Sequence, residues 1–343
     1  MSATEYPTWR RVREGAPADR YRARADLYRR IRTVFEARGF IEVETPLLVP
    51  APGMEPHLEV FETRLTTENG RSRRAFLTTS PEYQMKKLLA AGLPRIFQIG
   101  KAFRNREEAS RLHNQEFTIL EWYRTTVDYH DLIRDCEDLL LALAGGKHLT
   151  YGGQTIDLSP PWPRLTVAEA FHRHAGVDLD GDLLAQARSR GYTVDEGTTW
   201  EQAFTQILLT EVEPRFPRDR PLVLDEYPAS QAALARLKAD NPRRAERFEV
   251  YVAGIEIANA FGELLDATEQ ARRLEQEREE RQRSGRVPYD IDRDFIRALA
   301  AGIPPSAGIA LGVDRLLMIL TDAPSIRDVL WFPAAELFDL EEF

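Results

Sequence analysis

The sequence predicts an α+β fold, in which a mainly antiparallel sheet is flanked by helices. Residues 95–124 and 247–261 each contain two alternating apolar and polar runs joined by a turn, which is the pattern of an antiparallel hairpin. Most helical patterns lie between such hairpins instead of alternating with single strands. The sequence contains neither G-x-G-x-x-G nor G-x-x-x-x-G-K-S/T, so a doubly wound nucleotide-binding fold is not expected.

The individual elements follow from apolar periodicity and from turn residues. Helices are expected from the apolar spacing or the charge-rich composition of residues 19–38, 82–91, 128–144 and 266–284. A short strand from Phe40 ends at Pro46 in this prediction, because proline has no N–H to donate to a sheet. A turn at Ser80-Pro81 separates a strand from the second helix, and Gly308–Leu320 is expected to form a strand running into a helix. The charges of the helix over 266–284 are expected to face solvent.

Length and composition predict a single domain spanning residues 1–343, with a less certain insertion at about 147–242. The formal net charge of −9 repels polyanions, so tRNA is not expected as a partner without a local basic patch. The single cysteine, Cys136, fits a reducing cytosol and is expected to serve as packing. No apolar run has the length of a membrane helix, and the first residues lack the apolar core of a signal peptide. We therefore expect a cytoplasmic protein without a membrane partner.

The loop of the first hairpin, FRNREEASRLHNQEF, carries a high density of charge. It is either a solvated hairpin tip or a loop that grips a charged ligand. On the strand that follows, alternation puts Phe117, Glu121 and Tyr123 on one face, where a carboxylate is costly unless a cation meets it. That cation is either a neighbouring arginine or the ammonium of a substrate. Arg104, at the end of the preceding strand, could contact a phosphate through two hydrogen bonds.

The second hairpin is expected to turn at Ala253-Gly254. A two-residue turn places Tyr251 opposite Glu256 and Glu249 opposite Ala258, so that Glu249 and Glu256 are diagonal neighbours on one face. Two carboxylates this close repel each other. A Mg²⁺ ion bound through both carboxylates and the phosphates of ATP would relieve the repulsion.

Two further expectations concern the same hairpin. Salt bridges to Arg244 or Arg247 are the alternative to a metal ion. In a regular strand Asn259, Phe261 and Glu263 face away from Glu256, so a bulge near residues 260–262 would be needed to bring Glu263 into the same pocket.

The last strand is built from small residues. Gly308, Ala310 and Gly312 line one of its faces with almost no side-chain bulk, which allows a ligand or another backbone to approach closely. Arg315 follows at the start of a helix, where backbone N–H groups already favour anions. Together these features predict a phosphate contact at Arg315.

These segments, in this order, resemble the signature motifs of class II aminoacyl-tRNA synthetases. Motif 1 is GFIEVETPLLVP with its proline at Pro46, motif 2 is FRNREEASRLHNQEF, and motif 3 is GIALGVDRLLMIL. GIEIANAFGEL and SIRDVLWFP are similar to the lysine branch. TSPEYQMKKLLAAG, LEWYR and FEVYVAGIEIANAF most resemble the ligases that attach (R)-β-lysine to a lysine side chain of elongation factor P. The resemblance covers nearly the whole chain apart from about 147–242.

The resemblance implies a class II catalytic fold, a homodimer formed through motif 1, and ATP and Mg²⁺ as cofactors. The implied catalytic residues are Arg104 at the α-phosphate and Arg315 at the γ-phosphate. The implied nucleotide-binding residues are Arg104, Asn105, Glu107, Glu108, His113, Asn114, Phe117, Glu256, Ile257, Gly312 and Arg315. The implied amino-acid pocket consists of Ser80, Pro81, Glu82, Glu121, Tyr123, Asn259, Phe261, Glu263 and Ala310. The implied magnesium ligands are Glu249 and Glu256.

The implied reaction activates lysine or (R)-β-lysine as an aminoacyl-adenylate and transfers it to elongation factor P. About 20 residues precede the first helix, too few for the β-barrel that lysyl-tRNA synthetases carry ahead of motif 1. Ala310 stands where synthetases of the lysine branch have glycine, and its methyl group either alters the choice between α- and β-lysine or serves as strand packing. Two alternatives stay open: a truncated synthetase-like enzyme with another acceptor, and a non-catalytic regulatory paralogue.

The chain departs from the family pattern inside motif 2. Arg106 stands where the family has glutamate, and the loop is one residue longer, so the implied adenine contact is either Glu107 or Glu108. Gln115 replaces the proline of the family's His-Asn-Pro-Glu, and SIRDVLWFP resembles a lysyl-tRNA synthetase more than the ligase.

Overall fold

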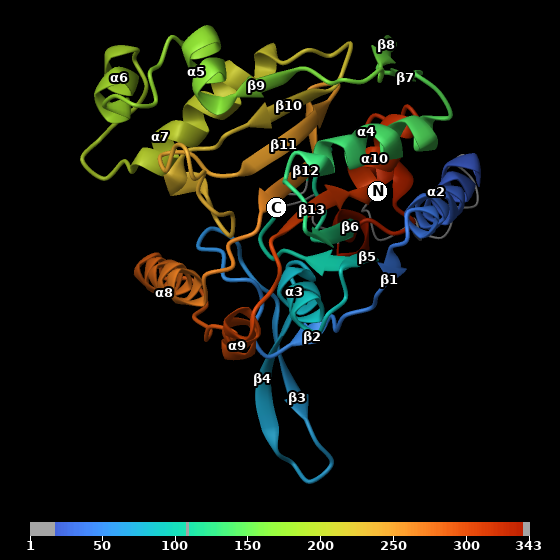
Figure 1. Cartoon of the computed structure of the whole chain (residues 1–343), viewed down its shortest axis with the longest axis vertical. Coiled ribbons are helices and arrows are strands. Elements are labelled where there is room, and N and C mark those ends of the chain that lie inside the picture. Colours follow the sequence, from blue (N-terminus) through green and yellow to red (C-terminus); the bar gives the residue numbers. More distant parts are fainter. Residues whose placement is uncertain (1–17, 108–109, 339–343) are drawn as a thin grey trace, which may run out of the picture. The chain divides into compact units, whose positions relative to one another are not determined.

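A computed structural model describes residues 18–107 and 110–338. These residues form two compact units, and each unit is described by itself. The second unit comprises Val127–Leu264 with Ala307–Ile309, and the first comprises the remainder. Strand pairs are mostly antiparallel and both units contain helices, which confirms the α+β fold class (Figure 1). None of the helices in the described part of the chain combines the length and apolar character that crossing a bilayer requires.

The first unit is organised around the hairpin of strands β5 and β6. Its elements are α2 (Ala18–Ala37), β1 (Ile41–Glu42), β2 (Leu48–Val49), β3 (Glu62–Thr66), β4 (Ser72–Leu77), α3 (Glu82–Ala90), β5 (Arg95–Phe103), β6 (Glu116–Thr125), α8 (Ala267–Arg283), α9 (Arg293–Ala301), α10 (Val313–Leu320), η5 (Ile326–Val329) and α11 (Ala334–Leu337). β5 pairs with β6 in antiparallel register and with β1 in parallel. β2, β4 and β3 form a smaller sheet, from which the β3–β4 hairpin projects (Figure 1).

The second unit is organised around the hairpin of strands β11 and β12. Its elements are α4 (Asp131–Ala144), β7 (His148–Tyr151), β8 (Gln154–Asp157), β9 (Arg164–Thr166), α5 (Val167–Ala175), α6 (Leu183–Ser189), α7 (Trp200–Ile207), η2 (Leu208–Val212), η3 (Glu213–Arg215), β10 (Leu222–Asp225), η4 (Ala229–Gln231), β11 (Arg247–Val252) and β12 (Ile255–Gly262). β10 pairs with β11 in antiparallel register and with β9 in parallel. Strand β13 (Ser306–Gly312) contributes residues to both units.

Several predicted elements lie where the sequence placed them. The β5–β6 hairpin, the helix starting at Glu82 and the strand running into a helix before Arg315 are all confirmed. The turn at Ala253-Gly254 is confirmed too, and both residues have positive φ, the backbone conformation of a tight hairpin turn. Cys136 is completely buried in α4, as expected of packing, and burial raises the pKa of its thiol well above the ordinary value.

Three local predictions were wrong. The strand predicted from Phe40 to Pro46 is only the two residues of β1, although the N–H of Val43 still donates to the carbonyl of Phe97 (2.8 Å). β2 begins after the proline, which has no N–H to continue a ladder. Helix α4 begins at Asp131 instead of residue 128. Helix α8 does not expose all its charges, since Arg281 is 0% exposed. Its guanidinium donates to the carbonyl oxygens of Glu55 (2.6 Å) and Leu58 (2.5 Å), which it ties to the helix.

Candidate active site

Motif 2 begins where β5 ends. Arg104 is the first residue after this strand, and its N–H donates to the carbonyl of Gln115 across the hairpin (2.9 Å). Its guanidinium lies 5.2 Å from the centre of the Phe117 ring, a cation–π arrangement. The side-chain N–H at Nε of Arg104 is buried without a hydrogen bond. The hairpin therefore holds a cation beside an aromatic face, with donor capacity left for an anion.

Motif 3 contacts motif 2 within the first unit. Arg315 lies in the first turn of α10, as predicted, and its guanidinium approaches the carbonyl oxygen of Leu112 (3.3 Å) and Nε2 of His113 (2.9 Å). An arginine is only a donor, so Nε2 of His113 must accept, and its Nδ1 then carries the proton and donates to Ser110 Oγ (2.9 Å). Arg315, predicted at the γ-phosphate, and His113, predicted at the nucleotide, thus lie together.

The rest of the motif 2 loop is partly occupied by structural contacts. Asn114 is 8% exposed and donates to the carbonyl of Glu116 (2.6 Å), while its Oδ1 accepts from the N–H of Ala334 at the start of α11 (2.9 Å). Glu107 lies 3.5 Å from Nε2 of His113, and Glu108 is outside the described residues. Asn114 therefore fastens the loop to the C-terminal helix, and its predicted role at the nucleotide stays a prediction.

Asn105 and Arg106 shape the start of the loop. The N–H of Asn105 donates to the carbonyl of Glu59 (2.9 Å), and its side-chain oxygen accepts from the N–H of Arg106 (2.9 Å). Arg106, the residue that departs from the family pattern, has φ 54°, a left-handed conformation that few non-glycine residues adopt. The departure in sequence thus coincides with a sharp turn of the backbone.

A buried carboxylate lies on the inner strand of the same hairpin. Glu121 is 1% exposed, its Oε1 accepts from Ser80 Oγ (2.6 Å), and its Oε2 accepts from the hydroxyl of Tyr123 (3.1 Å). Burial and the nearby charge of Glu82 raise the pKa of Glu121 to about 8, partly offset by these two hydroxyls and by Lys86. Such a carboxyl gains a favourable partner when a cation enters, because hydroxyl groups do not neutralise its charge.

The amino-acid residues predicted on α3 are part of the same cluster. Ser80 Oγ also accepts from the N–H of Glu82 (3.0 Å), so it caps the start of the helix while it holds Glu121. Pro81 is the N-cap residue of α3, with φ −75°. Glu82 pairs one turn later with Lys86, whose Nζ lies 2.6 Å from Glu82 Oε1. The structure therefore brings together Ser80, Pro81, Glu82, Glu121 and Tyr123.

The β11–β12 hairpin has a different register from the predicted one. Tyr251 lies opposite Glu256 as expected, but Glu249 lies opposite Asn259 and not opposite Ala258. The register shifts between Val250 and Tyr251 because β12 contains one extra residue, a β-bulge. The bulge predicted near residues 260–262 thus lies closer to the turn.

The bulge changes which side chains share a face. Opposed residues project from the same side of a sheet, so Glu249, Glu256 and Asn259 share one face, together with Phe261 opposite Arg247. A regular strand would have separated Asn259 and Phe261 from Glu256. The bulge therefore groups the predicted metal ligands with two of the predicted amino-acid residues.

Glu249 already has a cation in the second unit. Arg247 Nη2 lies 2.7 Å from Glu249 Oε1, and the hydroxyl of Tyr251 donates to Oε2 (2.8 Å). The guanidinium of Arg247 also lies 4.2 Å from the centre of the Tyr227 ring. The salt bridge considered as the alternative to a metal ion is thus present, whereas Arg244 pairs with Asp180 instead.

The chemistry of the donor set still fits magnesium. Among the described residues, no group of three or more histidine, cysteine, aspartate or glutamate side chains is arranged to hold a metal ion alone. Mg²⁺ commonly takes one or two carboxylates and fills its remaining positions with water and substrate phosphates, which matches Glu249 and Glu256 on one face. In that state Glu249 would share its charge between the ion and Arg247.

The remaining predicted residues lie on the strands as follows. Ile257 is 2% exposed, Glu263 is 1% exposed, and Ala310 and Gly312 are partly exposed at the end of β13. A Cβ atom added to Gly312 would meet only the Arg315 side chain, at 3.8 Å or more, so the protein's own packing leaves room there.

Sequence reasoning missed two buried charges beside these residues, Lys86 and Arg24, and named Arg247 only as part of the alternative to a metal ion. Lys86 and Arg247 pair with predicted site carboxylates, and Arg24 lies 2.6 Å from Asp314, which precedes Arg315. The first two have a local signal, since each is two or four residues from its partner. The Arg24 pair joins α2 to α10 and has none.

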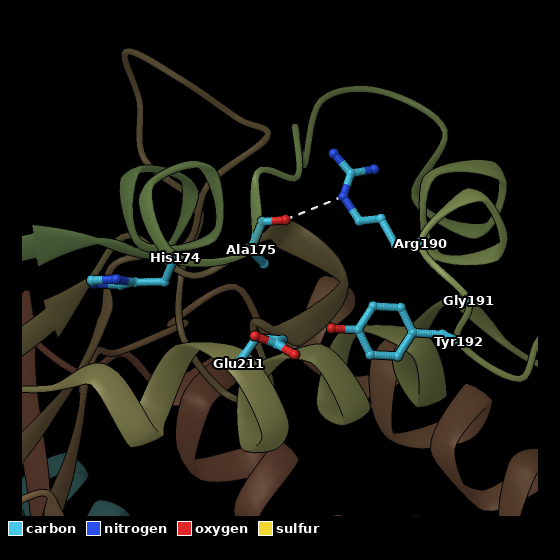
Figure 2. Close-up of a pocket in the computed structure, with 6 residues that line it drawn as sticks. All are labelled: His174, Ala175, Arg190, Gly191, Tyr192 and Glu211. Carbon is cyan, nitrogen blue, oxygen red and sulfur yellow. Dashed lines mark hydrogen bonds between the residues drawn. The ribbon is translucent and has the colours of Figure 1, made fainter.

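A pocket of about 350 Å³ lies elsewhere, in the second unit (Figure 2). Its lining residues come from α5, the segment after α6, and η2: His174, Ala175, Arg190, Gly191, Tyr192 and Glu211. Arg190 donates to the carbonyl oxygen of Ala175 (3.1 Å), so it closes the end of α5 (Figure 2). None of the predicted site residues lines this pocket.

Comparison with known proteins accounts for the motifs. The model of the family described as tRNA synthetases class II (D, K and N) matches residues 6–336. A protein of Hamiltonella defensa named elongation factor P–(R)-beta-lysine ligase is 41% identical over 325 residues, which cover 93% of this chain and 96% of that protein. The protein of the same name from Haemophilus influenzae is 41% identical, with 90% and 93% covered.

A second group of relatives carries another name. The lysine–tRNA ligase of Moorella thermoacetica is 38% identical over 319 residues, which cover 90% of this chain but 64% of that protein. The chain therefore belongs to the class II tRNA synthetase family of the D, K and N type and is an ATP-dependent amino-acid ligase.

Proposed function

We propose that the protein activates (R)-β-lysine, or lysine, with ATP and transfers it to a lysine side chain of elongation factor P. The observation that carries the proposal is Glu121, a buried carboxyl held by two hydroxyls and positioned to receive an ammonium group. Relatives named for this reaction are matched over 93–96% of their length, and the lysine–tRNA ligase over 64%. This chain is 41% identical to the relatives named for the elongation factor P reaction and 38% identical to the lysine–tRNA ligase, and the names at the higher identity favour a protein acceptor over tRNA.

In the proposed reaction, a carboxylate oxygen of the amino acid attacks the α-phosphorus of ATP. The bond to the bridging oxygen breaks, pyrophosphate leaves, and an aminoacyl-adenylate remains. Arg104 would neutralise charge at the α-phosphate and Arg315 at the γ-phosphate, while Phe117 would stack on the adenine. The amine of the acceptor lysine then attacks the acyl carbon, AMP leaves and an amide forms. Mg²⁺, held by Glu249 and Glu256, would supply further charge neutralisation at the phosphates.

The proposal includes a homodimer formed through motif 1 in the first unit. Ile41 is 50% exposed, and Leu47 and Leu48 are each 40% exposed. Neighbouring exposed aliphatic side chains on one short segment are typical of a surface that another chain covers.

The test is a competition between acceptors. Labelled (R)-β-lysine, ATP and Mg²⁺ are incubated with the protein, elongation factor P and tRNA for lysine in one reaction. Label on elongation factor P in a protein gel is the expected result. Acid-precipitable label on tRNA would overturn the choice of acceptor. ATP consumption with label on neither would leave the activation step and refute transfer to elongation factor P. An Arg104→Ala variant is the matched negative control, because it removes the proposed α-phosphate contact.

A further inference from the structure

Lys86 is a buried cation beside the carboxylates of the first unit. It lies on α3 one turn after Glu82 and is 1% exposed. Its Nζ is 2.6 Å from Glu82 Oε1 and 5.9 Å from the centre of the Phe295 ring on α9. Lysine is among the residues least often buried completely, and burying its ammonium group is costly unless a partner neutralises it.

The neighbourhood of Lys86 has an excess of negative charge. Glu82 and Glu121 face the same region, and the charge of Glu82 raises the pKa of Glu121 whereas the charge of Lys86 lowers it. The hydroxyls of Ser80 and Tyr123 contact Glu121, and Gln98 lies directly opposite it on β5; none of these groups carries a charge. Lys86 is therefore the cation that opposes protonation of Glu121 among these groups.

A second acidic group extends this pattern on α8. Burial, Glu55 and Glu82 raise the pKa of Glu277 to about 8, and Arg273 acts in the opposite direction. Glu121 and Glu277 both hold their protons up to about pH 8, in part because of the charge of Glu82, so the loss of a nearby cation would favour protonation further.

We infer that Lys86 is a positioning residue for the amino-acid site, which holds Glu82 in place and keeps the pair of Glu82 and Glu121 ready to bind one substrate ammonium. The inference rests on the function proposed above. Two ionised carboxylates and one lysine leave a single net negative charge, which one ammonium neutralises. Without Lys86, two ionised carboxylates in a dry site would have no cation to offset them, which favours protonation of Glu121. A protonated Glu121 lacks the negative charge that binds the substrate ammonium.

Lys87 provides a matched control on the same helix. Its Nζ lies 2.7 Å from Asp292 and 3.5 Å from Asp294, so it forms an ion pair of similar length that does not involve Glu82 or Glu121. Lys86→Met and Lys87→Met each remove one partly or fully buried lysine from α3. Only the first removes a cation from the proposed site.

The experiment is the pH dependence of amino-acid-dependent ATP–pyrophosphate exchange, measured from pH 6 to 9.5. We expect Lys86→Met to move the acidic limb of kcat/KM for the amino acid upward by about one pH unit, which lowers kcat/KM about tenfold below the limb. The KM for ATP should not change, and Lys87→Met should keep the limb of the wild type. Lys86→Arg, which restores the charge, should move the limb back towards that of the wild type.

Glu82→Gln gives a second measurement that does not depend on how Lys86→Met folds. It removes the negative charge that raises the pKa of Glu121, so the limb should move to lower pH, opposite to the shift in Lys86→Met. An unchanged limb in Lys86→Met that folds with the thermal midpoint of the wild type would overturn the inference, as would a limb in Glu82→Gln that moves upward or stays. If the wild type shows no amino-acid-dependent exchange, the proposed function fails instead.

Discussion

Glu121 in the β5–β6 hairpin and Glu249 in the β11–β12 hairpin are both buried carboxyl groups on a sheet face, yet their partners differ. Glu121 is held by the hydroxyls of Ser80 and Tyr123. Glu249 is held by one hydroxyl, from Tyr251, and by the guanidinium of Arg247. Burial raises the pKa of Glu121 to about 8. Among the described residues, the carboxyl group of the first hairpin thus lacks a cation in direct contact, which a ligand could supply. The carboxylate of the second hairpin is paired with an arginine on its own strand.

The difference indicates how each carboxylate would respond to a ligand. An ammonium that reaches Glu121 replaces a proton, so binding should release a proton below pH 8. Glu249 already pairs with Arg247, so a Mg²⁺ ion that reaches it would share the carboxylate with this arginine. The amino-acid site should therefore be pH-sensitive.

The largest expected effect is that of Glu121→Gln, which should lower activity towards the amino acid without lowering the stability of the fold. Glu121→Gln keeps the shape and the hydrogen-bonding oxygen of the protonated side chain but cannot balance an ammonium. We expect kcat/KM for the amino acid to fall by about a hundredfold to a thousandfold, as for a buried pair that loses one partner. The thermal midpoint should stay close to that of the wild type. Exchange kinetics and calorimetry on the same sample check both parts, and an equal loss in stability would contradict them.

The next effect should appear in stability. Arg247→Met removes the cation of Glu249 and leaves a buried carboxylate uncompensated, which should lower the free energy of unfolding by about 3–5 kcal/mol. Arg236→Met is the control, because Arg236 pairs with Glu246 (2.6 Å) at a more exposed position and should cost about 1 kcal/mol or less. Urea unfolding of the two variants tests the comparison. Similar losses in the free energy of unfolding would show that the Arg247–Glu249 pair contributes no more to stability than the Arg236–Glu246 pair.

The smallest effect, taken per pH unit and per group, is a dependence of stability on pH. Glu121 and Glu277 both have pKa values raised to about 8. Between the ordinary carboxyl range and pH 8, the folded state therefore holds protons that the unfolded state has released. Their contribution to stability is present below pH 4.5 and is lost as pH rises through 8, by at most about 1.4 kcal/mol per pH unit for each group.

Urea unfolding between pH 5.5 and 8.5 measures this slope. Glu121→Gln and Glu277→Gln should each flatten it. Glu269→Gln should leave it unchanged, because hydrogen bonds from Arg272 and Arg273 lower the pKa of Glu269 to about 2, outside the window. A wild-type stability that rises over this range would mean that neither carboxyl is protonated in the folded protein.

Local patterns predicted much of this molecule, and contacts between distant residues escaped prediction. Alternation correctly put Glu121 and Tyr123 on one face, and the turn at Ala253-Gly254 followed from its position between two strands. The burial of Arg281 could not be predicted, because α8 is charged on most sides and the carbonyl groups that Arg281 binds lie more than 200 residues earlier. The ion pair of Arg24 with Asp314 has the same character.

The hairpin register shows a further limit of sequence patterns. Ile257 is an ordinary strand residue, so nothing in the sequence marks it as the extra residue that shifts the pairing after Tyr251 and Glu256. Counting alternate positions from the turn therefore assigned Asn259 to the wrong face. The family resemblance assigned Glu256 and Asn259 to neighbouring roles without explaining how they could face one way, and the bulge supplies that explanation.

The bulge also divides the hairpin into two segments with different strand registers. Near the tip, Tyr251 pairs with Glu256, and nearer the base Glu249 pairs with Asn259. Asn259 is three positions after Glu256, an odd spacing that would place them on opposite sides of an unbroken strand. Deletion of Ile257 would leave a regular strand in which Glu256 and Asn259 are two positions apart and still share a face. Pairing Ile257 with Val250 in an unbroken ladder would instead turn Asn259 and Phe261 to the other side of the sheet. The exclusion of Ile257 from the pairing thus keeps Asn259 and Phe261 on the face of the carboxylates.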